Sequence, residues 1–270
     1  MAILVISSSL LALIAGLLFN RFAVPRILSG EDPPAMAIKE LISPLLSLTV
    51  LLLAFVLVSA AGSYGKAEEA SRAEARALDQ ISEAAEYVPV SDRLQIQADA
   101  VCYARAVASE EWDSMQYGKG SPVPSIWSTD LRRVFKSLEE DSAFSMLVAA
   151  DVKRSDEREE RLTQSTASVP VLVFWFLLVT LIITISSLGA CLPLKKNRGH
   201  VVALSVLTAL LAAILCIIQD VDQPYNGLIK VNPTAISEIE RQAHRDLMRA
   251  QGSYTLPCGE NGKELREKAN

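Results

Sequence analysis

The sequence predicts an all-α integral membrane protein with four transmembrane helices and a helical extramembrane stack. Half of its 270 residues are apolar and the mean hydropathy is +0.27, which is high for a soluble globular protein. The apolar residues gather in four blocks, each close to the roughly 20 residues that cross the hydrocarbon core as a helix. The segment between the second and third blocks holds 20 acidic and 13 basic residues from Lys66 to Arg161, so it must be solvated. This pattern excludes a cytosolic enzyme, a disordered tail and a secreted domain built on disulfides.

The first two spans are predicted at residues 1–20 and 41–62. The first block has no basic residues at its start, and the segment 21–34 offers no small-residue cleavage site. A retained span is therefore favoured over a cleaved secretory signal. The second span is the clearest of the four, and its Pro44 lies in the first turn, where a missing N–H costs little.

The third and fourth spans are predicted at residues 168–192 and 201–219. Pro170 lies where the third span enters the hydrocarbon, and Trp175 fits an anchor at the membrane interface. The fourth block is bounded by His200 and Asp220. Four spans put both termini on the same side of the membrane.

Residues 63–167 are predicted to form the extramembrane stack of helices. The segment 66–87 carries Ala, Leu and Ile near helical spacing and has no proline before Pro89, so it is expected to continue the second span as one long helix.

Three further helices are expected in the stack. The first should cover about 91–112, and the second should follow the loop 117–124. The third should run from about Asp141 into the third span. The predicted N-cap of the first is Ser91, and that of the second is Ser128 or Thr129. The charge run DVKRSDEREER, residues 151–161, is interpreted as a solvated helix face.

Residues 220–251 are predicted to form a turn followed by an amphipathic helix, and residues 252–270 a flexible tail. The oxygens of Asp220, Asp222 and Asn226 suit a hard cation such as calcium. The closing position of a calcium loop, however, holds Val231 instead of Glu. These three residues are therefore only weak metal candidates, and a structural turn is the default.

The sequence offers no signature of catalysis. His200 and His244 lie far apart without Cys or carboxylate at metal-ligand spacing, and there is no phosphate-binding Gly-rich loop or nucleophile elbow. We expect neither an enzyme nor a cofactor. The net charge of −5 argues against nucleic acid as a partner.

The membrane orientation is predicted from the two short loops, which share a side and hold six Lys or Arg residues: Arg21, Arg26, Lys39, Lys195, Lys196 and Arg198. By the positive-inside rule this side is cytoplasmic. The termini and the large helical segment then lie outside the cell membrane. The basic residues of the stack near the spans are interleaved with acids in a long loop, so they constrain the topology less.

The cysteines depend on this orientation. Cys102 and Cys258 lie on the same aqueous side, where an outer compartment favours a disulfide and a cytoplasmic one favours free thiols. Cys191 and Cys216 lie in or beside spans and are interpreted as small packing residues.

Several segments in order resemble the bestrophin-like four-helix bacterial membrane proteins, a family known as domain of unknown function forty-two thirty-nine. The segments are KAEEASRAEARAL, YARAVASEEW, REERLTQSTASVPVLVFW and DVDQPYNGLIKVNP. The residues that carry the motif are Glu111, Trp112, Arg161, Pro170, Asp222, Pro224 and Gly227. The chain departs from the family in having Tyr225 where Phe is frequent, and in a less basic first loop.

The resemblance implies kinship to bestrophins, which are oligomeric ion channels with an apolar constriction on one span. It suggests a homo-oligomer in the lipid bilayer, with the second span around a pore that conducts ions. Leu52, Phe55 and Val56 would then form a constriction that gates by dewetting. The alternative is that these three residues face neighbouring helices and lipid.

A second function class is a non-conducting membrane scaffold or sensor whose helical stack binds a partner. Trp112, Tyr117 and Trp127 would then serve as contact residues, although a helical stack can equally pack them inside.

Overall fold

The computed structural model describes residues 2–22, 38–192, 198–251 and 254–265. In these ranges every regular element is a helix, apart from an isolated bridge between Cys258 and Glu264. Four of the helices are long and apolar enough to cross a membrane. The predicted all-α membrane fold is therefore confirmed.

The chain divides into two compact units. One unit comprises residues 1–62 and 167–222, and the other comprises residues 63–166 and 223–270. We call the first unit the apolar bundle and the second the helical stack.

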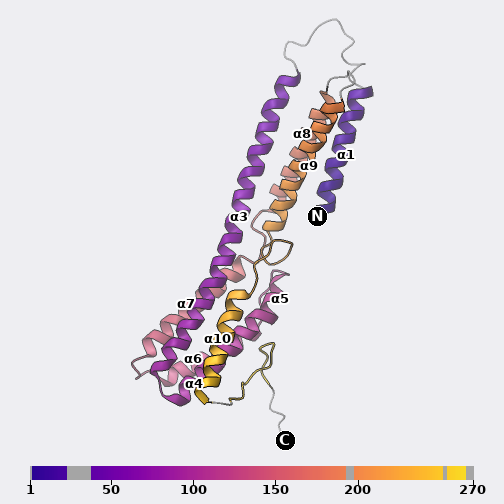
Figure 1. Cartoon of the computed structure of the whole chain (residues 1–270). Coiled ribbons are helices and arrows are strands. Elements are labelled where there is room, and N and C mark those ends of the chain that lie inside the picture. Colours follow the sequence, from indigo (N-terminus) through magenta and orange to yellow (C-terminus); the bar gives the residue numbers. More distant parts are fainter. Residues whose placement is uncertain (1, 23–37, 193–197, 252–253, 266–270) are drawn as a thin grey trace. The chain divides into compact units, whose positions relative to one another are not determined.

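The apolar bundle consists of α1 (Ala2–Phe22), the first part of α3 (Ile38–Ala84), α8 (Val171–Ala190) and α9 (Arg198–Val221). Figure 1 shows α1 beside α8 and α9. Leucine and isoleucine dominate the core of the bundle, which includes Leu13, Leu53, Leu181, Ile185 and Leu215. Because α1 contributes to this core, the first apolar segment packs as a member of the bundle.

Helices α1 and α8 touch through two glycines. A Cβ atom placed on Gly16 would lie 2.6 Å from the carbonyl oxygen of Ser186, and one placed on Gly189 would lie 3.0 Å from the Cα atom of Gly16. Small residues allow this close approach of two backbones in a membrane bundle. Asn20 fastens the end of α1, since its Nδ2 donates to the carbonyl oxygens of Gly189 (3.2 Å) and Leu192 (2.9 Å).

The helical stack consists of the rest of α3, α4 (Val90–Ala106), α5 (Trp112–Met115), α6 (Val123–Ser137), α7 (Phe144–Thr163) and α10 (Thr234–Gln251). The expectation that one long helix continues the second span is confirmed, because α3 is uninterrupted from Ile38 to Ala84. Its stack part bears alanines on the buried side, which lets α3 pack closely. A π-helical turn, Val107–Glu111, joins α4 to α5.

The helix expected from about residue 91 begins within one residue of that position, but the predicted N-caps of both helices are wrong, and α6 starts several residues earlier than expected. Helix α4 begins at Val90 after Pro89, and α6 begins at Val123 after Pro122, so proline rather than Ser91, Ser128 or Thr129 precedes the first turn. The fixed φ of proline suits that position. Ser128 and Thr129 lie inside α6, where their hydroxyls donate to carbonyl oxygens one turn earlier.

Residues 254–265 form a small hairpin, which differs from the expected flexible tail. The backbone N–H of Gly259 donates to Lys263 O (3.0 Å), and that of Leu265 donates to Pro257 O (2.9 Å). Residues 252–253 and 266–270 of the predicted tail lie outside the described residues.

Candidate functional site

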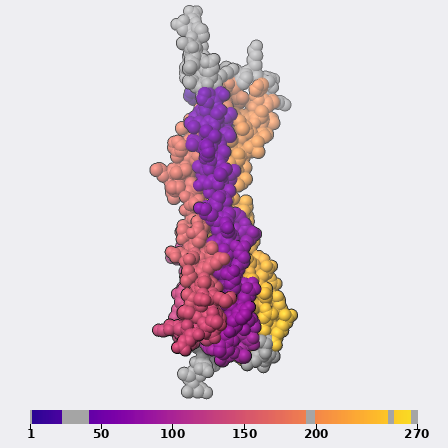
Figure 2. Space-filling model, turned by 90° about the vertical axis from the view of Figure 1, so that its left-hand side faces the viewer, coloured from indigo at the N-terminus to yellow at the C-terminus, as the bar shows by residue number. Residues whose placement is uncertain are grey.

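The pore candidates lie on the part of α3 that belongs to the apolar bundle. Phe55 is 66% exposed, whereas Leu52 and Val56 are half-buried and pack against the core of the bundle. Among the four membrane-capable helices, α3 buries the smallest share of its apolar window, 17% against 28%, 39% and 33%. Figure 2 shows α3 uncovered on one side. Other exposed apolar residues of α3 lie at helical spacing from Phe55: Leu48, Leu51 and Val58. This face of α3 therefore exposes a row of apolar side chains in the described chain.

Two threonines inside the spans serve helix packing. The hydroxyls of Thr49 on α3 and Thr184 on α8 lie 2.7 Å apart, and both side chains are buried. Each hydroxyl is also bonded within its own helix, to the carbonyl oxygens of Leu45 and Thr180. These threonines therefore join α3 to α8 within the bundle.

The motif residues Glu111 and Arg161 meet in the centre of the stack. Arg161 on α7 donates through Nε to Glu74 Oε2 of α3 at 2.6 Å, and through Nη2 to Glu111 Oε2. The side chains of Arg161 and Glu111 have no exposed surface, and that of Glu74 is 1% exposed. Burial lowers the pKa of Arg161, but the charges of Glu74 and Glu111 outweigh it and raise that pKa. The guanidinium is therefore permanently charged between two carboxylates.

Glu111 is held by a second arginine. Arg158 Nη2 donates to Glu111 Oε1 at 2.6 Å, and it also donates to the carbonyl oxygen of Ser121 in the loop before α6. Burial raises the pKa of Glu111, but the hydrogen bond from Arg158 and the charge of Arg161 lower it overall. The π-helical turn thus presents an ionised Glu111 to two arginines of α7.

Trp112 links this ion pair to the loop after α9. The Arg161 guanidinium lies 5.3 Å from the centre of the Trp112 ring, and Trp112 meets Tyr225 edge to face at 5.3 Å. Trp112 Nε1 donates to Val231 O, and the Tyr225 hydroxyl donates to Ala67 O of α3. The motif residues of the stack therefore form one connected packing unit.

The interpretation of residues 151–161 as a solvated helix face is wrong for one side of α7. Asp151, Arg154 and Arg161 are buried, and Arg154 lies over the Tyr103 ring at 4.4 Å while it pairs with Asp151. Lys153, Glu159 and Glu160 on the other side of α7 are exposed. The spacing of the inward residues, 151, 154, 158 and 161, follows one helix face and is the signal that indicates their burial.

Glu74 was not among the predicted site residues. It lies on the face of α3 that carries the buried Ala70, Ala73 and Ala77. A carboxylate on an alanine face of a helix is expensive to bury without a partner, so its position in the pattern already indicates a cation opposite it.

The motif residues Asp222 and Pro170 lie together in the apolar bundle. Asp222 Oδ1 accepts hydrogen bonds from Ser168 N (2.9 Å), Ser168 Oγ (2.8 Å) and Val169 N (2.9 Å). Pro170 follows directly and precedes the first residue of α8. Asp222 therefore fixes the backbone from which α8 starts.

Pro224 and Gly227 shape the loop after α9. The N–H of Val231 donates to Pro224 O at 2.8 Å and closes the loop, and Gly227 has φ = 137°, which a residue with a side chain rarely adopts. Among the described residues, no three His, Cys, Asp or Glu side chains are grouped as metal ligands. Asp220 and Asn226 stay weak metal candidates. One carboxylate oxygen of Asp222 already accepts hydrogen bonds from three protein donors.

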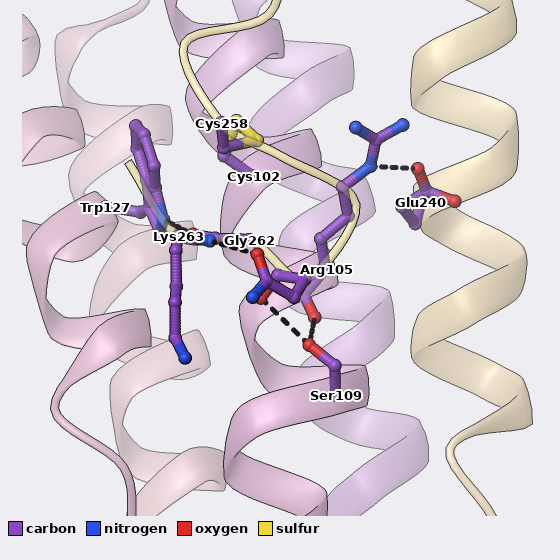
Figure 3. Close-up of a disulfide and its surroundings, with 9 residues drawn as sticks. Cys102, Arg105, Ser109, Trp127, Glu240, Cys258, Gly262 and Lys263 are labelled. Atoms are coloured by element: carbon purple, nitrogen blue, oxygen red, sulfur yellow. Dashed lines mark hydrogen bonds and ion pairs between the residues drawn. A yellow bond between two sulfur atoms is a disulfide. The ribbon is translucent and has the colours of Figure 1, made fainter. Parts of the chain in front are cut away.

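A disulfide joins the stack to the C-terminal hairpin. Cys102 of α4 is bonded to Cys258, with Cα atoms 5.7 Å apart, and Figure 3 shows this bond beside the contacts of the hairpin. Trp127 Nε1 donates to Gly262 O at 2.7 Å, and Ser109 Oγ donates to Asn261 O at 2.9 Å. Cys191 and Cys216 are free.

The three aromatic residues proposed as partner contacts lie in different environments. Trp112 is 7% exposed and Trp127 is 2% exposed, so both belong to the core of the stack. Tyr117 is 80% exposed. Two of the three therefore serve packing and offer no surface to a partner.

The profile of the bestrophin-like domain matches residues 6–236 of the chain. Three structures of a bacterial bestrophin homologue from Klebsiella pneumoniae are similar. A point-mutant structure has a TM-score of 0.70 at 11% identity, covering 92% of this chain and 99% of that one. The structure phased with zinc has a TM-score of 0.69 at 11% identity over 93% and 99%, and a second mutant has 0.64 at 13% over 94% and 98%. None of the curated proteins matches this chain.

Proposed function

This chain belongs to the bestrophin-like family, and we propose that it forms a homo-oligomeric ion channel in the cell membrane with α3 bounding the pore. Bestrophins are ion channels, and the same activity is proposed for this chain. Its partners are the lipid bilayer, other copies of the chain, and the ions that pass.

The observation that carries the proposal is the uncovered apolar face of α3. Phe55 is 66% exposed and Val58 is 71% exposed on a helix that buries less of its apolar window than the other three. Lipid is one cover for such a face, but a symmetric ring of copies brings the same helix of each copy to a common axis. Apolar side chains around an axis form a pore that water leaves readily.

The proposed constriction consists of Leu52, Phe55 and Val56. Phe55 projects from the exposed face, and the half-buried Leu52 and Val56 flank it against the bundle. In this arrangement Phe55 would narrow the pore, and Leu52 and Val56 would fix the position of the Phe55 side chain. A constriction of this kind needs no cofactor and no catalytic residue.

Recording from purified protein in planar bilayers under asymmetric salt tests the proposal. The triple variant Leu52→Ala, Phe55→Ala and Val56→Ala should raise conductance or open probability, because it widens and wets the constriction. The matched control replaces three exposed residues of α8 with Ala, namely Leu172, Phe176 and Val179. This control should conduct like the wild type. Silence from a folded oligomer would overturn the proposal and favour a non-conducting scaffold. Equal changes in the currents of both variants would overturn the constriction at Leu52, Phe55 and Val56.

We propose further that the helical stack and the termini lie outside the cytoplasm. The six basic residues of the short loops support this orientation. The Cys102–Cys258 bond adds independent support, because such bonds persist in oxidising compartments and are rare in the cytosol.

Labelling with a membrane-impermeant maleimide tests the orientation. In a background with Cys191→Ser and Cys216→Ser, intact cells should label Tyr117→Cys, whose position is 80% exposed in the stack. Lys195→Cys should react only after permeabilisation. The reverse pattern would put the stack in the cytoplasm.

A further inference from the structure

The C-terminal hairpin lies directly on α4 and the π-helical turn, and we call residues 254–265 the strap. A Cβ atom on Gly262 would lie 2.2 Å from the backbone nitrogen of Ala106, so the strap backbone touches the α4 backbone there. Lys263 Nζ lies 2.8 Å from Glu110 Oε1, and Trp127 Nε1 donates to Gly262 O at 2.7 Å. The disulfide at Cys258 makes this attachment covalent.

A carboxyl group with an unpartnered oxygen is buried in α4 next to this attachment. Asp99 is 4% exposed, and its Oδ2 atom has no hydrogen-bond partner among the described residues. Asp99 lies one helical turn before Cys102, on the same side of α4. A buried carboxylate oxygen without a donor is costly, whereas the protonated acid is much less so.

The groups that face Asp99 favour its neutral form. Burial, together with the charge of Asp130 on α6, raises the pKa of Asp99 to about 7, while Arg133 opposes this effect. Arg133 is itself paired with Asp130 at 2.7 Å. From the strap, Tyr254 packs against the core, and burial and the Asp99 charge raise the pKa of its phenol.

We propose that Asp99 is a proton-binding site that controls how tightly the strap is docked on α4. When Asp99 is neutral, the strap closes over it. When Asp99 ionises, the carboxylate needs water, and the strap opens to admit it. The disulfide keeps the strap attached to the stack, so the opening is local and reversible.

The direction of the pH effect follows from linkage. Asp99 has its ordinary pKa of 3.8 when solvated and a pKa of about 7 when buried as it is with the strap docked. Docking is therefore strongest below pH 3.8, weakens by up to about tenfold per pH unit between these two values, and levels off above them.

The reduction rate of the Cys102–Cys258 bond measures the opening. Both cysteines are buried, 0% and 3% exposed, so a water-soluble phosphine reaches the bond only when the strap lifts. The assay uses the full chain in nanodiscs with Cys191 and Cys216 alkylated beforehand, and mass spectrometry follows alkylation of the released Cys258. Each rate is divided by the rate at which the same phosphine reduces oxidised glutathione at the same pH. This division removes the pH dependence of the phosphine's own reactivity.

The normalised rate for the wild type should rise by at least tenfold from pH 5 to pH 8 and level off near pH 7. Asp99→Asn mimics the neutral acid, so its rate should stay low and flat, while the exposed control Asp113→Asn should follow the wild type. Asp130→Asn, a second variant that leaves Asp99 in place, should move the midpoint to lower pH, because it removes the negative charge that raises the pKa of Asp99 and releases Arg133. A flat wild-type profile, an unchanged slope in Asp99→Asn, or an unmoved midpoint in Asp130→Asn would overturn the proposal.

Discussion

Arg161 and Glu74 lie 2.6 Å apart, Nε to Oε2, although neither side chain has more than 1% of its surface exposed. The pair joins α7 to α3, and Glu111 adds the π-helical turn to the same guanidinium. Three segments that are distant in sequence are thus tied by one cation. Charges buried so completely are stable only because each has its partner.

Removal of Arg161 should destabilise the stack strongly. Arg161→Leu leaves Glu74 and Glu111 buried without this partner, and breaking such a pair typically costs about 3 to 5 kcal/mol. The control Arg72→Leu breaks an exposed pair with Glu68, one turn away in α3, and should cost less than about 0.5 kcal/mol. Thermal unfolding followed by circular dichroism compares the two. Equal losses would mean that the buried pair contributes no more than the exposed one.

Acid should weaken the same network. Because Arg158 and Arg161 lower the pKa of Glu111 in the folded protein, its contribution to stability is complete above its ordinary value of 4.5 and is lost as pH falls from there through the folded value. The difference in melting temperature between the wild type and Glu111→Gln should therefore be large at pH 7 and shrink towards pH 3. A difference that grows in acid would contradict this sign.

The two classes of helical glycine should respond oppositely to alanine. Gly16→Ala puts a Cβ 2.6 Å from Ser186 O, so α1 and α8 must separate, at a cost of about 1 to 3 kcal/mol. Gly65→Ala adds a methyl group at a position where, apart from neighbouring residues of α3, no described atom lies within 4 Å, and it should stabilise α3 by about 0.5 to 1 kcal/mol. The free energy of unfolding of both variants is measured in the same detergent and compared with that of the wild type. Destabilisation by Gly65→Ala would reveal a neighbour at that position in the assembled protein.

Calcium should leave the stability unchanged. Asp222 Oδ1 already accepts three hydrogen bonds from Ser168 and Val169, so a cation would have to compete with them. Melting temperatures in calcium and in a chelator should coincide, while Asp222→Ala should cost about 1 to 3 kcal/mol by leaving those donors unpaired. A calcium-dependent rise in melting temperature that Asp222→Ala abolishes would restore the metal site.

The spans could be predicted because hydropathy is local. Each window of about 20 apolar residues identifies a membrane helix on its own, without knowledge of its neighbours. The long α3 followed equally from alanine spacing and the absence of a breaker before Pro89. The family motif also identifies Glu111, Trp112 and Arg161 from the sequence alone, without their contacts.

The remaining features depend on contacts distant in sequence. Arg161 pairs with Glu74 across 87 positions, and a charge run alone does not reveal which of its faces has partners. The strap was not predicted, because a short polar segment with glycines has no hydrophobic periodicity. Its structure depends on contacts with Cys102, Trp127 and Ser109, which are distant in sequence. The disulfide itself depends on the compartment, which residue spacing does not specify.

The Cys102–Cys258 bond spans 156 positions, and both α8 and α9 lie between its ends. During synthesis Cys102 emerges before either of these helices, and Cys258 emerges after both. A chain that inserted only one of them would strand Cys258 across the membrane from Cys102, and the thiols would never meet. The bond can therefore form only in a chain that has inserted both α8 and α9. A non-reducing gel of whole cells should separate these disulfide-bonded molecules from misassembled ones with free thiols.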